Sequence, residues 1–274
     1  MLRIIQQSLK RNNIERSALP DYLAFAHLES NFDPHVASSM GAAGLFQLMP
    51  GTAHRLAMLH PGIPSELTIY NPIWRSGRPL LQRGPAARYP VRILRWYSEQ
   101  LRKRLLELRQ QVPDDDHRAL RLTALDSRFD PTTNATLATF YVELLRKRHF
   151  GRYRCFATTG GPRVCGRFGK RDATIMAAAC FHLGAPLVER LVARSGAWSS
   201  SAYIRAALGS HNRSYVDNGR YLLRLQRRAR TYRRLIVTDA LNPKAVTRAF
   251  GDATIARNLF ATWPAPEPVT QLTF

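Results

Sequence analysis

Apolar residues recur every three or four positions along most of this sequence, and this spacing constrains the fold more than any other feature. Leu137, Tyr141 and Leu144, for example, share one helical face. The spacing predicts helices over 16–30, after Pro50, over 93–111, from Asn134, twice within 172–194 and over 215–235. The pattern is lost over 60–91 and again in the cysteine-bearing segment, and the inserted segments are placed at about 60–124 and 151–171, with strand signals confined to the second. The chain is therefore predicted to be mainly α, with two inserted segments, one of which carries a small β-hairpin.

The chain is strongly basic. Its 41 Lys and Arg residues against 19 Asp and Glu residues give a net charge of +22, which attracts polyanions over a Debye length. Composition alone leaves nucleic acid, anionic cell wall, membrane and acidic glycans open as partners. No zinc finger, basic zipper or recognisable helix-turn-helix motif occurs with the Arg-rich run 215–235. Nucleic acid is therefore disfavoured, and the run is interpreted as a solvated face.

Compartment signals are weak. Residues 1–13 show no continuous apolar run and no small-residue cleavage site, so no secretory signal is predicted. A membrane span is not predicted either, because no apolar stretch is long enough to cross a membrane. Cys155 and Cys165 flank a turn at Gly160 and Gly161. They would form a disulfide in an oxidising compartment or stay reduced in the cytosol, and the sequence leaves both open.

One acidic cluster raises the question of a metal. Asp114, Asp115 and Asp116 precede His117, but they follow Pro113 without ligand spacing elsewhere in the chain. A solvated loop and helix cap is the better interpretation. Neither a metal nor another cofactor is predicted.

Residues 28–53, LESNFDPHVASSMGAAGLFQLMPGTA, form the most distinctive stretch. Its ordered elements are Glu29-Ser30, Pro34 to Ser38, Gly44-Leu45-Phe46-Gln47 and Met49-Pro50-Gly51-Thr52-Ala53. This order resembles the signature of the family 1 lytic transglycosylases, the goose-lysozyme-like SLT domain. The preceding run is most similar to the membrane-bound murein transglycosylase D branch. The resemblance implies a lysozyme-like helical core and peptidoglycan as the substrate.

Glu29 is the candidate general acid. It ends a predicted helix among Phe25, Leu28 and Phe32, and an apolar site raises the pKa of a carboxyl enough to protonate a leaving oxygen at neutral pH. Most glycosidases add a second carboxylate. Asp33 is better placed to cap or turn the chain. The resemblance implies that Glu29 acts alone, and that the C6 hydroxyl of N-acetylmuramic acid attacks C1 to give a 1,6-anhydro sugar.

The resemblance also implies substrate-binding residues in the same stretch. Ser38 would hydrogen-bond near the acid, Gln47 would hold the sugar, and Gly44 would let the chain approach the glycan closely. Phe46 is a candidate for lining the cleft, with an equally good interpretation as core. Outside the family motif, Ser38 and Gln47 would be ordinary turn residues.

Two later motifs depart from the family pattern. Phe181 and His182 stand where the family has Tyr and Asn, so a ring is kept but a hydroxyl that contacts the glutamate is lost. His182 would offer one donor and one acceptor and, titrating near pH 6.5, would suppress activity in acid. The alternative is a His182 ring turned into the core and bonded to a backbone carbonyl. Tyr215 matches a family substrate-binding tyrosine, while His211 replaces an acidic residue.

The sequence thus predicts a lysozyme-like transglycosylase domain over 1–237 and a C-terminal extension over 238–274. Its expected partner is peptidoglycan glycan strands, with the basic face adding attraction to an anionic wall or membrane surface. The expected location is the periplasm or cell envelope. Two alternatives remain open. One is a catalytically weak peptidoglycan-binding or scaffold protein of a secretion machine or phage particle, and the other is a goose-type hydrolysing muramidase.

Overall fold

The computed structural model describes residues 1–38, 41–61, 63, 99, 103, 106–107, 123, 126–151, 153–157 and 163–263. Several sequence predictions lie outside these residues in whole or in large part. They are the helix over 93–111, the segment 60–124 that contains it, the Asp114 loop, the turn at Gly160 and Gly161, and the tail beyond Trp263. Within the described part of the chain, no helix is long and apolar enough to cross a membrane.

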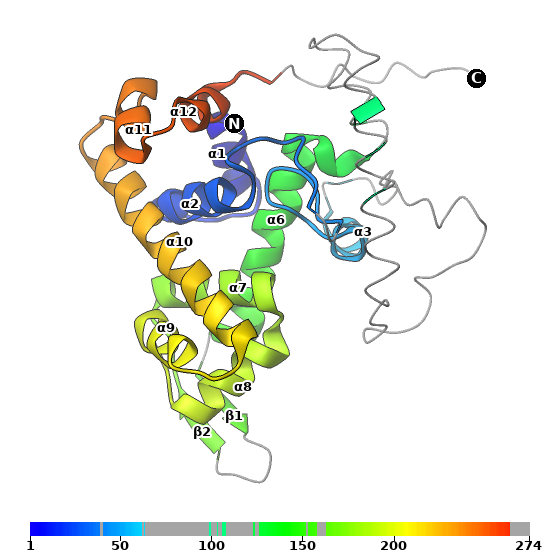
Figure 1. The fold of residues 1–274 in the computed structure, drawn as a ribbon. Helices are drawn as coiled ribbons and strands as arrows, with labels where there is room; N and C mark the ends of the chain where they lie inside the picture. The colour runs from blue at the N-terminus through cyan, green and yellow to red at the C-terminus, as the bar shows by residue number, and fades with distance from the viewer. Residues whose placement is uncertain are drawn as a thin grey trace, which may run out of the picture.

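Helices make up nearly all of the regular secondary structure among the described residues (Figure 1). The helices that precede the hairpin are α1 (Leu2–Arg11), η1 (Arg16–Ala18), α2 (Leu19–Ser30), α3 (Pro50–Leu59), η3 (Ser127–Phe129), α6 (Pro131–Leu145) and the π-helix η4 (Arg146–Phe150). The helices that follow the hairpin are α7 (Lys170–Leu183), α8 (Ala185–Ser195), α9 (Ser200–Leu208), α10 (Arg213–Val237), α11 (Pro243–Phe250) and α12 (Ala253–Phe260). The predicted fold class, mainly helical with one small hairpin, is confirmed.

The helices begin where the local chemistry favours a start. Proline occupies the first turn of α2, α3, α6, α8 and α11, where its missing N–H has no helical partner to lose. At the start of α6, the Asp130 carboxylate accepts bonds from the backbone N–H groups of Thr132 and Thr133. Asn134, which the sequence suggests as the cap, lies inside α6 and bonds to another part of the chain.

Helix α2 forms the centre of the core. Every residue from Leu19 to His27 is buried, as expected of a helix with apolar surroundings on all sides. Helix α10 packs along α2 and also contacts α7 and α9, and α1 packs against α6. In Figure 1, α10 runs diagonally past α2 toward α9. Residues far apart in sequence therefore meet around α2.

The cysteine-bearing segment is a two-stranded antiparallel hairpin, β1 (Arg154–Ala157) and β2 (Arg163–Gly166). Cys155 and Cys165 face each other in the register and form a disulfide with an S–S distance of 2.02 Å. This settles the choice that the sequence left open. Phe156 stacks on Trp198 at 5.5 Å between ring centroids, which fixes the hairpin to the segment between α8 and α9.

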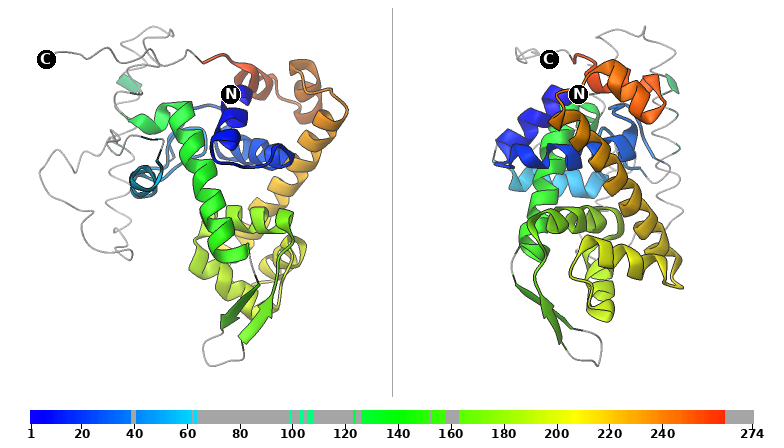
Figure 2. Two further views of the ribbon diagram at one scale, coloured as in Figure 1. Left: turned by 180° about the vertical axis from the view of Figure 1, so that it is seen from behind. Right: turned by 90° about the vertical axis from the view of Figure 1, so that its left-hand side faces the viewer.

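Two helices, α11 and α12, follow α10 in a region where the sequence pattern predicts no element. Val246 and Leu259 are completely buried, so both helices belong to the packed structure. The Met1 amino group donates to the Ala261 carbonyl at 2.9 Å, and Figure 2 shows this end of the chain beside α1. The described part of the C-terminal extension is thus folded onto the core.

Candidate active site

Glu29 lies in the last turn of α2, just before Asn31 ends the helix in the left-handed conformation with φ at 52°. The residue is partly buried, and removal from water raises the pKa of its carboxyl to about 7. The Tyr221 hydroxyl on α10 donates to Glu29 Oε1 at 2.7 Å, which opposes this rise because the bond favours the carboxylate. A carboxyl with a pKa near neutrality can both donate and accept a proton.

Apolar rings occupy the turn of α2 that precedes Glu29. Phe25 packs edge-on against Phe46 at 5.4 Å and against Phe181 at 4.9 Å between ring centroids. Phe32, the other ring expected near the acid, packs instead with His27 and Tyr232 in the core. The cluster of Phe25, Phe46 and Phe181 connects α2, the loop after it and α7.

The loop over residues 36–48 is anchored directly to α2 and α6. Ser30 Oγ, next to Glu29 in sequence, donates to the Leu45 carbonyl at 2.8 Å. The Asn134 side chain accepts from the Phe46 N–H at 2.8 Å and donates to the Ala43 carbonyl at 3.0 Å. Asn134 therefore holds this loop through both ends of its amide.

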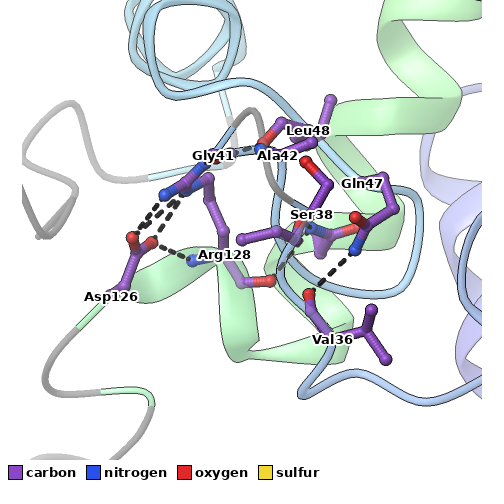
Figure 3. A network of polar contacts seen from close by, with 10 residues as sticks. Val36, Ser38, Gly41, Ala42, Gln47, Leu48, Asp126 and Arg128 are labelled. Atoms are coloured by element: carbon purple, nitrogen blue, oxygen red, sulfur yellow. Dashed lines mark hydrogen bonds and ion pairs between the residues drawn. The ribbon is translucent and has the colours of Figure 1, made fainter. Parts of the chain in front are cut away.

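A buried ion pair provides a second anchor for the loop. Arg128 and Asp126 are both fully buried, with Nη2 and Oδ2 2.7 Å apart. Arg128 Nη1 donates to the Gly41 carbonyl at 2.7 Å and to the Leu48 carbonyl at 2.8 Å (Figure 3). Arg128 thus ties together the two arms of the loop. Nothing in the sequence pattern indicated this pair, although both residues immediately precede a predicted helix.

Gly44 has a clear steric requirement. Its φ is +82°, and a Cβ there would lie 2.0 Å from the Arg128 carbonyl oxygen and 2.3 Å from Asn134 Nδ2. Any larger residue would push away the segment that carries the ion pair. At Gly44 the group that approaches closely is this chain's own backbone, and the approach to a glycan stays a prediction.

The other predicted loop residues also help to shape the loop. Ser38 Oγ accepts a bond from the Ala42 N–H at 3.0 Å. Gln47 Nε2 donates to the Val36 carbonyl at 2.8 Å and to the Gly44 carbonyl at 2.9 Å (Figure 3). The Phe46 ring is completely buried, so the structure favours its interpretation as core over cleft lining.

Helix α7 brings the two departures from the family pattern close to Glu29. Phe181 packs between Phe25 and Tyr141, 5.5 Å from the second ring. His182 is exposed and stacks on Tyr221, with ring centroids 4.3 Å apart and planes 10° apart. The histidine is thus one ring away from the residue that bonds Glu29. It does not turn into the core toward a backbone carbonyl, because its Nδ1 contacts the Asn218 side chain.

Tyr215, the remaining predicted site residue, lies in the first turn of α10 and is only 4% exposed. The tyrosine that reaches Glu29 is Tyr221, farther along the same helix, and it was not among the residues predicted from sequence. A signal was present, because Asn218 and Tyr221 are polar residues among the buried positions of α10. Polar groups on an apolar stripe usually have specific partners.

No group of three or more His, Cys, Asp or Glu side chains suited to a metal occurs among the described residues.

The segment that supplies Glu29 and its loop also matches a known family. Residues 3–74 match the Transglycosylase SLT domain. An SLT domain is lysozyme-like and indicates peptidoglycan transglycosylase activity, with peptidoglycan as the substrate that it binds. The match ends before α6, α7 and α10, and it does not distinguish a branch, so similarity to the D branch stays a prediction. No curated protein and no solved structure matches the chain.

Proposed function

We propose that this chain is a peptidoglycan lytic transglycosylase in which Glu29 is the single general acid and base. The observation that carries the proposal is the burial of Glu29, which raises the pKa of its carboxyl to about 7. An ordinary surface glutamate would be ionised at neutral pH and would have no proton to give. The SLT match over residues 3–74 supplies the substrate class independently of this pKa.

The proposed reaction cleaves the β-1,4 bond between N-acetylmuramic acid and N-acetylglucosamine. The Glu29 carboxyl gives its proton to the glycosidic oxygen, and the bond from that oxygen to C1 breaks. The substrate's N-acetyl group stabilises the resulting cation. The C6 hydroxyl of the N-acetylmuramic acid residue then bonds to C1, and the hydroxyl proton returns to Glu29. The product is a 1,6-anhydro sugar, and no water is consumed.

The surroundings of Glu29 favour a single carboxylate over a pair. Asp33, close to it in sequence, accepts a bond from the His35 N–H at 2.8 Å and so closes its own turn. Tyr221 is the titratable side chain bonded to Glu29, and burial keeps the pKa of its hydroxyl well above the usual value. It therefore acts as a neutral donor that positions the carboxyl.

The remaining assignments follow from the same proposal. The transglycosylase domain extends over 1–237, and Ser38, Gly44, Gln47, Phe181, His182 and Tyr215 shape or contact the glycan site. The Cys155–Cys165 disulfide supports a location in the periplasm or cell envelope, because disulfides persist in oxidising compartments.

Mass spectrometry of the fragments released from purified peptidoglycan sacculi tests the proposal. Fragments ending in 1,6-anhydro sugar are the expected result. Fragments with a reducing end would contradict it in favour of a goose-type hydrolysing muramidase. Binding to sacculi without release would contradict it in favour of a binding or scaffold protein.

A further inference from the structure

A chain of polar side chains runs from the core to the Glu29 site through α9, α10 and α7. The Tyr203 hydroxyl donates to Asn218 Oδ1 at 3.0 Å. Asn218 Nδ2 lies 3.3 Å from the Ala179 carbonyl oxygen and 3.0 Å from His182 Nδ1. Tyr203 and Asn218 are completely buried, whereas His182 is exposed. The contacts therefore link a buried amide to an imidazole at the surface.

The partners of Asn218 fix which end of its amide is nitrogen. The Ala179 carbonyl can only accept a hydrogen bond, so the amide atom beside it has to be the NH₂ group. One hydrogen of that group points to the carbonyl and the other to His182 Nδ1. The opposite end is the carbonyl oxygen, which accepts from Tyr203. The amide is thus engaged at both ends.

This arrangement in turn fixes the proton of His182. Nδ1 has to be an acceptor, because it faces the Asn218 NH₂ group, and the single proton of the neutral ring is therefore on Nε2. A protonated imidazolium would set an N–H against an N–H and lose the bond. Among the described residues His182 Nε2 has no hydrogen-bond partner, so its donor is available to a ligand.

We propose that Tyr203 and Asn218 are positioning residues that hold His182 as its neutral Nε2–H tautomer, and that this N–H binds the acetamido carbonyl oxygen of a glycan beside Glu29. An amide carbonyl is the strongest uncharged acceptor on an N-acetylated sugar. The stack of His182 on Tyr221 places the donor one ring away from the residue that bonds Glu29. The choice of glycan rests on the proposed function, whereas the tautomer does not.

The tautomer is tested by nitrogen NMR of the His182 ring in the full chain. We expect a single Nε2–H form in the unmodified protein and a mixture of tautomers in Asn218→Leu. Tyr203→Phe removes only the hydroxyl and should give a smaller change in the same direction, which keeps the test informative if the Leu variant fails to fold. An Nδ1–H form, or a mixture in the unmodified protein, would overturn the proposal.

The ligand is tested by binding to a Glu29→Gln protein, which keeps the probe intact. The probes are one soluble peptidoglycan glycan in N-acetylated and N-deacetylated form. His182→Phe keeps a flat ring over Tyr221 but has no donor, and it should weaken binding of the N-acetylated probe by roughly 3- to 10-fold, the scale of one hydrogen bond. Binding of the N-deacetylated probe should change little.

Equal affinity of the two proteins for the N-acetylated probe would overturn the recognition role while leaving the proposed function standing. Failure of the Glu29→Gln protein to bind either probe would overturn both the proposed function and the glycan assignment. The NMR result would still decide the tautomer in that case.

Discussion

Two regions border Glu29, and they are held together in different ways. The loop over residues 36–48 is fixed mainly through backbone groups that are bonded by Ser30, Asn134 and Arg128. The opposing region on α7 and α10 consists of side chains that contact one another, namely His182, Asn218 and Tyr221. The first region should therefore govern stability, and the second should govern the chemistry of Glu29.

This difference also separates the region that matches a known family from the region that does not. The match over residues 3–74 contains the loop but neither α7 nor α10. The sequence resemblance predicts that Phe181 and His182 on α7 stand in place of a tyrosine and an asparagine, which stays a prediction because the match ends before α7. In the structure, the hydroxyl that bonds Glu29 and the amide that contacts His182 both come from α10, through Tyr221 and Asn218.

Replacing Glu29 with Gln should have the largest effect, because it removes the catalytic carboxyl that both regions border. We expect the release of glycan fragments to fall by about 100-fold or more, the usual contribution of general acid catalysis. Retention of full activity would contradict the assignment of Glu29.

Stability provides the control for this variant. Because the pKa of Glu29 is raised in the fold to about 7, its contribution to stability is lost as pH rises toward and through that value. Above it, the native protein has to hold a buried carboxylate and the Gln variant does not. Glu29→Gln should therefore unfold at the same or a higher temperature than the native chain at pH 8, a result that separates lost chemistry from lost folding.

The second largest effect is expected in the loop region. Arg128→Met should lower the free energy of unfolding by about 3–5 kcal/mol, because it removes the guanidinium that pairs with the buried Asp126 carboxylate. Denaturant unfolding measures this loss. The double variant Asp126→Leu with Arg128→Met should recover part of it, since both charges of the pair are then removed. A loss below about 1 kcal/mol in Arg128→Met would argue against this role for the ion pair.

The sequence predicted what depends on neighbouring residues. Helix periodicity, the break after Ser30 and the family signature around Glu29 all lie within short stretches, and the structure confirms the helices and the hairpin there. The contact from Tyr221 to Glu29 joins residues 192 positions apart, and that from Asn134 to Phe46 joins residues 88 apart. Such pairs depend on how the helices pack, which periodicity does not specify.

Helices α11 and α12 were not predicted from the sequence, although local signals for both are present. Asn242 and Asp252 directly precede α11 and α12, and their side chains accept bonds from the backbone N–H groups of Ala245 and Thr254. Pro243 follows the first cap, a typical helix start. By contrast, Phe46 gave no local indication of its burial, because a ring in a family motif suits a cleft as well as a core.

Tyr221→Phe tests whether the α10 region controls the acid. The hydroxyl bond favours the carboxylate of Glu29, so its removal should raise the pKa of Glu29 further and move the alkaline limit of activity to higher pH. Activity at neutral pH should fall by about 10-fold, as the carboxyl loses one positioning bond.

Tyr232→Phe is the matched control for this variant, because Tyr232 lies on the same helix but its hydroxyl bonds His27 in the core. It should lower the melting temperature without moving the alkaline limit. An alkaline limit that is the same in Tyr221→Phe as in the native enzyme would contradict the role of Tyr221.

A smaller effect is expected for activity at acid pH. The sequence predicts that His182 suppresses activity as it becomes protonated near pH 6.5, and the structure changes this prediction. Partial loss of contact with water lowers the pKa of His182 below its ordinary value, Arg224 lowers it further, and Asp217 opposes them. Tyr221 stacks on the ring and bonds Glu29 beyond it. His182 should therefore stay neutral at pH 6.5, and His182→Asn should leave the activity profile above that pH unchanged in shape. A His182 titration midpoint at or above 6.5, measured by NMR, would restore the acidic limit expected from sequence.

The smallest effect should come from the exposed arginines of α10, of which Arg224 also acts on the pKa of His182. Among the exposed arginines of α10, Arg213 and Arg220 pair with Asp217, whereas no ion pair among the described residues involves Arg224, Arg227, Arg230 or Arg234. Arg233 is different, because it pairs with Asp21 at 3.4 Å, and Arg228 is partly buried. The exposed face is thus an uncompensated positive surface on the helix that also carries Tyr221.

If this face draws the enzyme to an anionic wall, binding of the Glu29→Gln protein to sacculi should weaken several-fold between about 0.01 M and about 1 M salt, as the Debye length falls from about 30 Å to about 3 Å. Changing Arg224, Arg227, Arg230 and Arg234 to Gln should reduce binding at low salt and flatten this dependence. Arg190→Gln with Arg194→Gln, on the exposed face of α8, controls for a general loss of charge and should leave most of the dependence in place. Equal salt dependence in both variants would show that attraction comes from the net charge of +22 as a whole and not from α10.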